Sequence, residues 1–335
     1  MKPQFPLWAV SLACAAACAP SHAYDVLTHL AVRAVEHTVE RAIIPANVQK
    51  VKQQGSFKDG SGVAPSNLPA AAGGFASCRD TFANGAIPVV NAPNARALCF
   101  DGFAVLYSPE RKTPIYSAEK LTRARIADAK GEQRTENFFE DARLPASERS
   151  YLNDYRGSGF DRGHTSPAGD MPTPDSMAQS FSLANMVPQA PENNRGAWAD
   201  IEKATRKYVQ RSSGNVYVIT GPHYESGNCP FVLNAQRALQ AKGLPLPASA
   251  PEVVSVAASR AGYKPPYRYD AQQCTIGASK VAVPSHLFKL VYDANTGKSW
   301  AHWLQNVDWA QPSAPISYEE LVRRTGIDFL PGKQI

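Results

Sequence analysis

The stretch at residues 154–171 limits the possible fold of this chain most strongly. It is rich in Gly and contains Pro, so we do not expect it to be helical. At its centre is the tetrad Asp161-Arg162-Gly163-His164. The tetrad brings together a proton acceptor, a cation that matches phosphate and an orienting carboxylate. The fold must therefore present these side chains from non-helical backbone.

A second polar cluster occupies residues 185–206. Within it, Asn194, Trp198, Glu202 and Arg206 are spaced by four, which on a helix places them on one slowly drifting stripe. Asn194 stands where this helix should begin, and its amide oxygen could bind a hard cation such as Mg²⁺. Glu202 could hold a water bound to that cation, and Arg206 could reach a phosphate.

These residue types fit the hydrolysis of a phosphodiester. The reaction needs a base for the attacking water and positive charge for the transition state and the leaving oxygen. An imidazole with a pKa of ~6.5 accepts protons near neutral pH, which suits His164. The guanidinium of Arg162 matches phosphate oxygens. Gly163 lets the backbone turn or a substrate approach, and Asp161 anchors the loop or holds an arginine.

Taken together, the two clusters resemble the DNA/RNA non-specific endonuclease family. These ββα-metal (His-Me finger) nucleases include secreted bacterial nucleases and mitochondrial endonuclease G. The resemblance covers residues 78–331 and rests on order, distance and residue type together. Its motifs are the tetrad, Asn185-x-x-Pro188-Gln189, Asn194-x-Gly196-Ala197-Trp198-x-x-x-Glu202, Val283-Pro284-x-x-x-Phe288-Lys289 and Thr325-Gly326-x-x-Phe329-x-Pro331.

The resemblance implies a role for each site residue. His164 would be the general base, and Asn194 the one direct protein ligand of a single Mg²⁺, which Mn²⁺ can replace. Glu202 would hold metal-bound water. Arg206 would stabilise the transition state or the leaving group.

The remaining site residues would shape the site or contact the substrate. Asn185 would belong to the catalytic set by shaping the site. Asp161 and Gly163 would support it. The chain departs from the family pattern at Phe181, where some members carry a polar residue. Gln189, like Asn185, would shape the site and support the metal region. Arg162 would belong to the catalytic set, either facing phosphate or acting structurally by pairing with a carboxylate. The side chains expected to contact nucleic acid are Arg162, Gln189 and Arg206.

The expected fold class is α+β, with a mixed or antiparallel central sheet and flanking helices, because strand patterns precede and follow a central helix. The resemblance adds a ββα-metal motif. Residues 124–153 are polar and predict a long surface excursion. A helix at 318–325 should stop at Gly326. Strands are expected at 100–107, 115–121, 215–220, 281–283, 288–292 and 300–304, and the central helix at 197–211.

Residues 1–23 are typical of a signal peptide, with Lys2, an apolar run at 7–17 and small residues before a cut after Ala23. A buried helix of the mature fold and a lipid anchor on Cys18 fit less well. The run is too short to span a bilayer, so we expect no membrane in the mature form. The prediction is an exported protein, periplasmic or secreted.

Cleavage after residue 23 leaves four cysteines, and an even number in an exported chain indicates disulfides. Three pairings are open. The sequential one, Cys78–Cys99 and Cys229–Cys274, closes the smallest loops and is the prediction. A zinc site is the rival, but the spacings contain no Cys-x-x-Cys knuckle.

The mature chain divides into two parts. Residues 24–77 are expected to be an N-terminal helical segment (24–50) followed by a linker, and residues 78–335 the endonuclease domain. The helical segment could be a docking helix, a pro-segment or part of the core. A homodimer or a protein partner bound through residues 24–50 is therefore left open.

The net charge of +6 and the sequence pI of 8.9 favour polyanionic partners. The predicted function is a Mg²⁺-dependent endonuclease that cuts DNA and RNA, single- or double-stranded, with little sequence preference. Two alternatives are open. One is a catalytically silent nucleic-acid-binding module or secreted effector on the same fold, and the other is a metal phosphodiesterase acting on a small ester or a lipid.

Overall fold

The computed structural model describes residues 74–227, 229–244, 269–270 and 273–333. The predicted signal peptide (1–23) and the predicted helix at 24–50 lie outside the described residues, as does most of the 53–77 linker. The described chain begins with two short 3₁₀ helices, η3 (Ala76–Thr81) and η4 (Ala83–Gly85). No helix in the described ranges is both long and apolar enough to cross a membrane.

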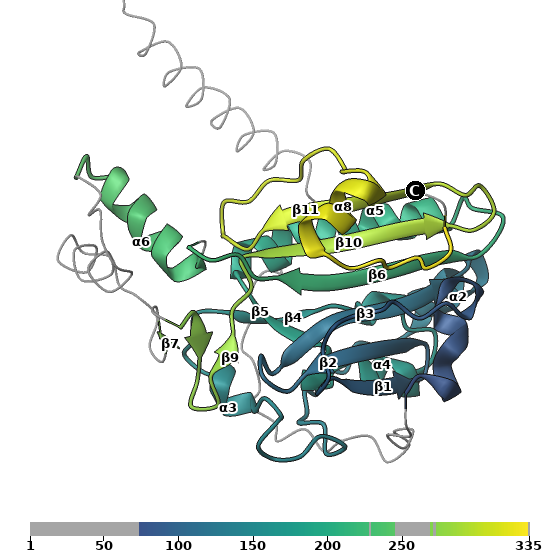
Figure 1. Cartoon of the computed structure of the whole chain (residues 1–335), viewed down its shortest axis with the longest axis horizontal. Helices are drawn as coiled ribbons and strands as arrows, with labels where there is room; N and C mark the ends of the chain where they lie inside the picture. The colour runs from purple at the N-terminus through teal and green to yellow at the C-terminus, as the bar shows by residue number, and fades with distance from the viewer. Residues whose placement is uncertain (1–73, 228, 245–268, 271–272, 334–335) are drawn as a thin grey trace, which may run out of the picture. The chain divides into compact units, whose positions relative to one another are not determined.

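A six-stranded sheet forms the centre of the described chain, with the strand order β1-β2-β3-β6-β10-β11 (Figure 1). Every neighbouring pair is antiparallel, so the α+β prediction is confirmed with the antiparallel form of the sheet. The strands are β1 (Arg96–Phe100), β2 (Phe103–Ser108), β3 (Thr113–Leu121), β6 (Val216–His223), β10 (His286–Asp293) and β11 (Ser299–Gln305).

Helices flank this sheet, and most of them are short. The α-helices are α2 (Arg123–Asp128), α3 (Leu152–Tyr155), α4 (Pro174–Ser180), α5 (Ala199–Val209), α6 (Pro230–Gln240) and α8 (Tyr318–Thr325). The 3₁₀ turns are η5 (Ala129–Gly131), η6 (Ala168–Asp170) and η7 (Leu183–Asn185). As predicted, α8 ends at Gly326, which has the left-handed φ of 70° common at helix ends.

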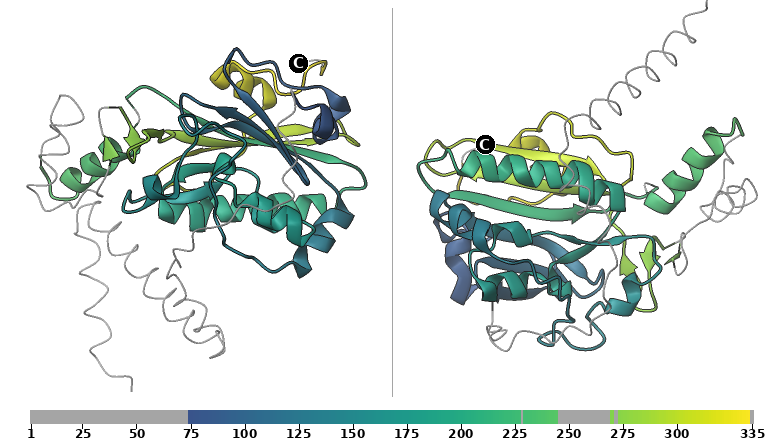
Figure 2. Two further views of the ribbon diagram at one scale, coloured as in Figure 1. Left: turned by 90° about the horizontal axis from the view of Figure 1, so that it is seen from below. Right: turned by 180° about the vertical axis from the view of Figure 1, so that it is seen from behind.

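The two faces of the sheet bury separate cores, because alternate side chains of a strand point to opposite faces. On one face Leu287 packs with Trp198 and with helix α5. On the other face Phe288 packs with Leu321 of α8 and with Phe329. Helices α5 and α8 therefore cover opposite sides of the sheet (Figure 2), and we refer to the α5 face and the α8 face.

The tetrad lies on a separate two-stranded antiparallel ribbon, β4 (Asp161–His164) and β5 (Met186–Gln189). Directly after β5 the chain becomes helical, first through a π-helical turn, η8 (Asn193–Trp198), and then through α5. We call β4, β5, η8 and α5 the ribbon–helix unit. Its core residues pack against the α5 face of the sheet, so both clusters singled out in the sequence meet there.

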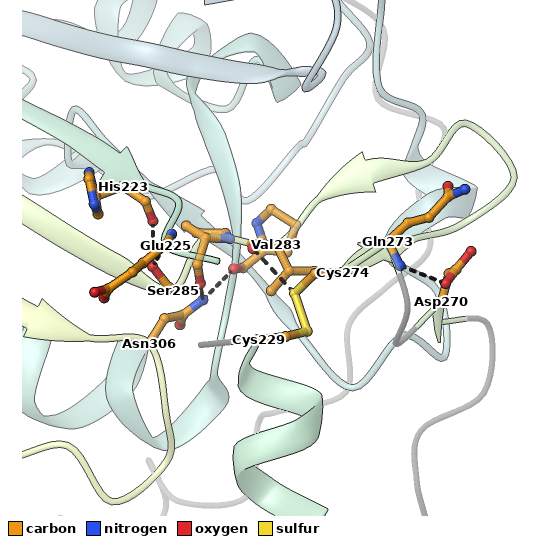
Figure 3. The surroundings of a disulfide bond; sticks show 11 residues. His223, Glu225, Cys229, Asp270, Gln273, Cys274, Val283, Ser285 and Asn306 are labelled. Carbon is orange, nitrogen blue, oxygen red and sulfur yellow. Dashed lines mark hydrogen bonds between the residues drawn. A yellow bond between two sulfur atoms is a disulfide. The ribbon is translucent and has the colours of Figure 1, made fainter. Parts of the chain in front are cut away.

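Both predicted disulfides are present, Cys78–Cys99 and Cys229–Cys274, which excludes a zinc site on these four cysteines. The second bond joins the start of α6 to a three-stranded sheet of β7 (Tyr269–Asp270), β8 (Thr275–Ile276) and β9 (Val281–Ala282). Figure 3 shows this disulfide, with the Cys274 Sγ 3.6 Å from the Val283 carbonyl oxygen. Near it, Phe231 of α6 packs edge-on against Phe160, the residue before the tetrad.

Two predicted strands have different bounds in the structure. The strand expected at 100–107 is a hairpin, because β1 ends at Phe100, a turn follows, and β2 begins at Phe103. The strand expected to close before Gly221 and Pro222 continues through both to His223. Pro222 is tolerated because β6 pairs there only with β10, so its missing N–H lies on the unpaired side.

The surface excursion predicted at 124–153 was also wrong in part. Phe138, Phe139, Asp141 and Leu144 are buried. Phe139 donates a backbone hydrogen bond to Phe181 and accepts one from Leu183, which ties the segment to the chain just before β5. In the central helix, Ala204 is exposed and Thr205 is buried.

Gly163 should be essential to the ribbon. A Cβ atom at this position would lie 2.1 Å from the Oε1 and 2.7 Å from the Cβ of Gln189 on the paired strand. We therefore expect Gly163→Ala to lower the free energy of unfolding by roughly 1–3 kcal/mol, measured by chemical denaturation. Gly131→Ala is the matched control, because its added methyl group meets nothing within 4 Å. Equal stability of the two variants would contradict the close approach.

Candidate active site

His164 ends strand β4, where its backbone pairs with Met186. The side chain is 9% exposed, and its Nε2 atom is covered without a hydrogen-bond partner in the described part of the chain. The rings of Phe138 and Phe181 flank the imidazole at centroid distances of 5.8 and 5.1 Å. A buried ring nitrogen that lacks a partner indicates a place where a water or ligand group binds.

The pKa of His164 is held well below its ordinary value, first by burial and then by the positive charges of Arg134 and Arg162. Burial disfavours the charged imidazolium, and nearby cations disfavour it further. The ring is therefore neutral at neutral pH, so one of its nitrogens has a lone pair free to accept a proton.

Asp161, at the other end of β4, joins the ribbon to the helix. Its carboxylate accepts a hydrogen bond of 3.0 Å from the Asn194 Nδ2 atom. It also binds the Arg195 guanidinium at both oxygens, at 2.8 and 2.7 Å. The prediction that Asp161 holds an arginine is confirmed, and the arginine is Arg195.

This contact fixes the orientation of the Asn194 amide. Because the nitrogen donates to Asp161, the oxygen is turned away from that carboxylate, and it has no hydrogen-bond partner within the described ranges. Asp161 and His164 stand at the two ends of β4, three strand steps or about 10 Å apart, and an odd number of steps points their side chains to opposite faces of the strand. Asn194 is therefore tied to the same ribbon that carries His164, although the two residues are far apart in the sequence.

Gln189 is fully buried, so the predicted contact with nucleic acid is wrong. Its Nε2 atom donates to the Asn193 Oδ1 atom at 2.8 Å, and Asn193 in turn donates to the Gln305 carbonyl oxygen. Gln189 therefore braces the start of the helix against strand β11. It has no surface to offer a substrate.

Asn185 is also fully buried, and its contacts fit the site-shaping role that the resemblance implies. Its oxygen accepts hydrogen bonds from Thr165 and Ser166, and its nitrogen donates to the carbonyl oxygens of Ser166 and Ser180. The amide is saturated by these partners. Asn185 holds the loop that follows His164 in place and does not itself face a reacting group.

Glu202 and Arg206 lie on successive turns of α5, as the spacing predicted. Arg206 donates to the Oδ1 atom of buried Asp170 at 2.9 Å, so this arginine is anchored by a carboxylate. Burial raises the pKa of Glu202, with Lys289 and Arg206 opposing the shift and Asp170 adding to it. Glu202 therefore lies among charged groups between the helix and the sheet.

The α5 face of the sheet supplies further charges to this layer. Lys289 is buried and donates to the Thr220 Oγ1 atom at 2.8 Å. Glu119, also buried, lies 3.7 Å from Arg125, and burial raises the pKa of its carboxyl group to about 8. We call Glu119, Asp170, Lys289 and Arg125, together with Glu202 and Arg206, the buried charge layer.

Arg162 and Arg134 are the two guanidinium groups whose charges help to lower the pKa of the His164 imidazole. Arg162 lies over the Phe138 ring at 4.2 Å, and Arg134 over the Phe181 ring at 5.3 Å. The charge of Arg134 also lowers the pKa of Glu202, so this arginine acts on both groups. Sequence reasoning missed Arg134, because it stands in a polar segment without periodicity. The only available signal was the aromatic pair Phe138-Phe139 that follows it.

The arrangement suits attack on a phosphate ester. It offers a neutral base, guanidinium groups for phosphate oxygens, a free amide oxygen and a carboxylate nearby. Neither Asn185 nor Gln189 takes part directly. Both instead hold the backbone that carries the reacting groups.

Comparison with known proteins gives a consistent result. Residues 83–334 match the model of the DNA/RNA non-specific endonuclease family. Human mitochondrial endonuclease G is 29% identical over 244 residues, which is 69% of this chain and 68% of that protein. Mitochondrial nuclease 1 of Schizosaccharomyces pombe is 36% identical over 125 residues, covering 37% of this chain and 38% of that nuclease.

The mitochondrial EXOG nuclease of Xenopus laevis is 29% identical over 240 residues, 68% of this chain and 56% of that protein. The chain thus spans between about a third and two thirds of these relatives' own lengths. A chain of the crystal structure of the EndoG/EndoGI complex superposes with a TM-score of 0.50 at 25% identity, covering 70% of this chain and 85% of that one.

The protonation of His164 can be tested without any assumption about activity. We expect its imidazole to titrate below the ordinary histidine pKa of ~6.5 in an NMR titration, with the signal assigned by His164→Ala. Arg134→Ala should raise this pKa, because one repelling charge is removed, but burial should still keep it low. Arg237→Ala, on helix α6, is the control and should leave it unchanged. An imidazole that titrates at or above 6.5 would contradict the buried neutral base.

Proposed function

Because this chain belongs to the DNA/RNA non-specific endonuclease family, we propose that it is a Mg²⁺-dependent endonuclease that hydrolyses phosphodiester bonds of DNA and RNA with little sequence preference. The observation that carries the proposal is the buried imidazole of His164 on a ribbon clamped through Asp161 to Asn194. Lack of sequence preference fits a site built from groups that contact phosphate, because such contacts position a substrate without reading its bases.

In the proposed reaction His164 takes a proton from the attacking water. As the new P–O bond forms, the bond to the 3′ oxygen breaks, and negative charge moves to that oxygen. Arg162 and Arg134 are placed to hold phosphate oxygens beside the imidazole. Arg206, anchored by Asp170, offers a positive charge near the leaving group.

The residues present fit a single hydrated Mg²⁺. The free Asn194 oxygen is a hard ligand of the kind that Mg²⁺ prefers, and Glu202 is the nearby carboxylate that could hold its waters. Elsewhere in the described part of the chain, no group of three or more His, Cys, Asp or Glu side chains is placed to hold a metal. When bound, the cation supplies Lewis-acid charge to the phosphate.

We further propose that the mature chain acts outside the cytoplasm. Two disulfides and the signal-like residues 1–23 support this, because disulfides persist in oxidising compartments. A homodimer or a protein partner that uses residues 24–50 is a separate proposal, supported only by the helical pattern of that segment.

The decisive experiment is plasmid nicking with Mg²⁺ and with EDTA. We expect nicking only with the metal, and His164→Ala should lower turnover at least roughly 10²-fold while DNA binding survives. A wild-type chain that binds DNA but never nicks it would instead be the catalytically silent module. A chain that cleaves bis-nitrophenyl phosphate but not plasmid would be a small-ester phosphodiesterase.

Asn194→Ala should raise the Mg²⁺ concentration needed for half-maximal activity, because the one direct protein ligand is lost. The measurement is a Mg²⁺ titration of the nicking rate. Asn94→Ala is the matched control, since Asn94 is exposed beside the β2–β3 hairpin. If the two variants give the same titration curve, Asn194 is not the ligand.

A further inference from the structure

Two aromatic rings meet at the imidazole of His164. Phe181 contacts it edge-on, with an interplanar angle of 87°, and Phe138 contacts it at a tilt of 52°. The two phenylalanines also pack edge-to-face on each other at 5.0 Å. Phe138 is 8% exposed and Phe181 is fully buried. Together they form a wall on one side of the candidate base, which we call the aromatic wall.

Each ring of the aromatic wall also carries a guanidinium group. Arg162 lies 4.2 Å from the centre of Phe138, and Arg134 lies 5.3 Å from the centre of Phe181. Both distances are within the range of cation–π attraction. Arg162 and His164 are two residues apart on β4 and so point to the same side of the strand, which is why Phe138 contacts both.

Backbone hydrogen bonds hold the aromatic wall in place. Phe139 N donates to the Phe181 carbonyl oxygen at 3.2 Å, and Leu183 N donates to the Phe139 carbonyl oxygen at 2.8 Å. Ser182 Oγ donates to buried Asp141 at 2.9 Å. These bonds join the segment after Arg134 to the segment before β5, so both rings belong to segments that are hydrogen-bonded to each other.

An aromatic face orients a guanidinium group without cancelling its charge. Arg134 also meets Glu136 at 3.0 Å, but both side chains are more than half exposed, and such pairs contribute little in water. The ring faces of Phe138 and Phe181 therefore add an orienting contact to Arg162 and Arg134 that leaves their positive charge in place.

We propose that Phe138 and Phe181 are positioning residues, whose ring faces set Arg162 and Arg134 as a pair of phosphate clamps beside His164. This inference rests on the proposed function, because the anion that the clamps would hold is the substrate phosphate. It assigns the two rings a role in binding as well as in packing.

The test is a double-mutant cycle between Phe138→Leu and Arg162→Ala. Leu retains an apolar side chain but removes the ring face, so we expect KM for DNA to rise about three- to tenfold with a smaller change in kcat. In the Arg162→Ala background the same change should have little further effect, because the group that the ring orients is absent. Phe138→Tyr keeps the ring face and should restore KM to within twofold of the wild type.

Trp303→Leu is the control, because it also removes a ring that contacts an arginine. Arg324 lies over the Trp303 ring at 5.0 Å. Trp303 is on the α8 face, away from the ribbon–helix unit, so KM should not change. Thermal unfolding of each variant establishes that it is folded. If Phe138→Leu does not fold, Phe138→Met replaces it in the cycle.

The same cycle is measured in DNA binding by fluorescence anisotropy without metal. Two results would overturn the inference while leaving the proposed nuclease function standing. One is that Phe138→Leu and Arg162→Ala lower the affinity for DNA additively. The other is that Phe138→Leu changes neither KM nor Kd. If the wild-type chain does not cut nucleic acid, the proposed function fails, and coupling or additivity in Kd still decides whether the ring positions Arg162.

Discussion

The carboxylate of Asp161 determines how strand β4 meets the helix that follows β5. It accepts one hydrogen bond from Asn194 and two from Arg195, and the pair with the guanidinium is bidentate, the strongest form of such a contact. This contact adds a direct side-chain link between β4 and the helix to the link that runs through β5 and Gln189. With it, the amide oxygen has a defined direction, and Glu202 and Arg206 follow Asn194 about two and three helical turns later.

A layer of charges lies beneath this helix and is costly to bury. Asp170 holds Arg206 from the side of the loop after β4, and Arg125 donates to the carbonyl oxygen of that same Asp170. Lys289 and Glu119 add one charge of each sign from the sheet, and Glu119 gives up much of its charge by retaining a proton. Buried ion pairs contribute little net stability. We interpret the buried charge layer as a set of specific contacts that holds helix α5 in one position over the sheet.

Much of the candidate site could be predicted from sequence, because spacing along a helix or strand determines which residues share a face. The ββα motif implied by the family resemblance agrees with His164 on a strand and Asn194 on a helix, and the choice of the smallest cysteine loops gave both disulfides. Spacing does not reveal what packs over a face. Gln189 was assigned to the substrate, yet β11 and the helix start enclose it. Arg134 was missed because the ring that it covers belongs to a distant segment.

The Cys229–Cys274 disulfide fixes both ends of the chain segment between these two residues. Phe231, just after the first cysteine, packs on Phe160, and Val283, nine residues after the second, pairs with the Cys274 backbone. The sequence between the cysteines can therefore lengthen, shorten or diverge in evolution without moving the ribbon beside it. In this chain, engineered insertions placed inside that covalent loop should be tolerated best.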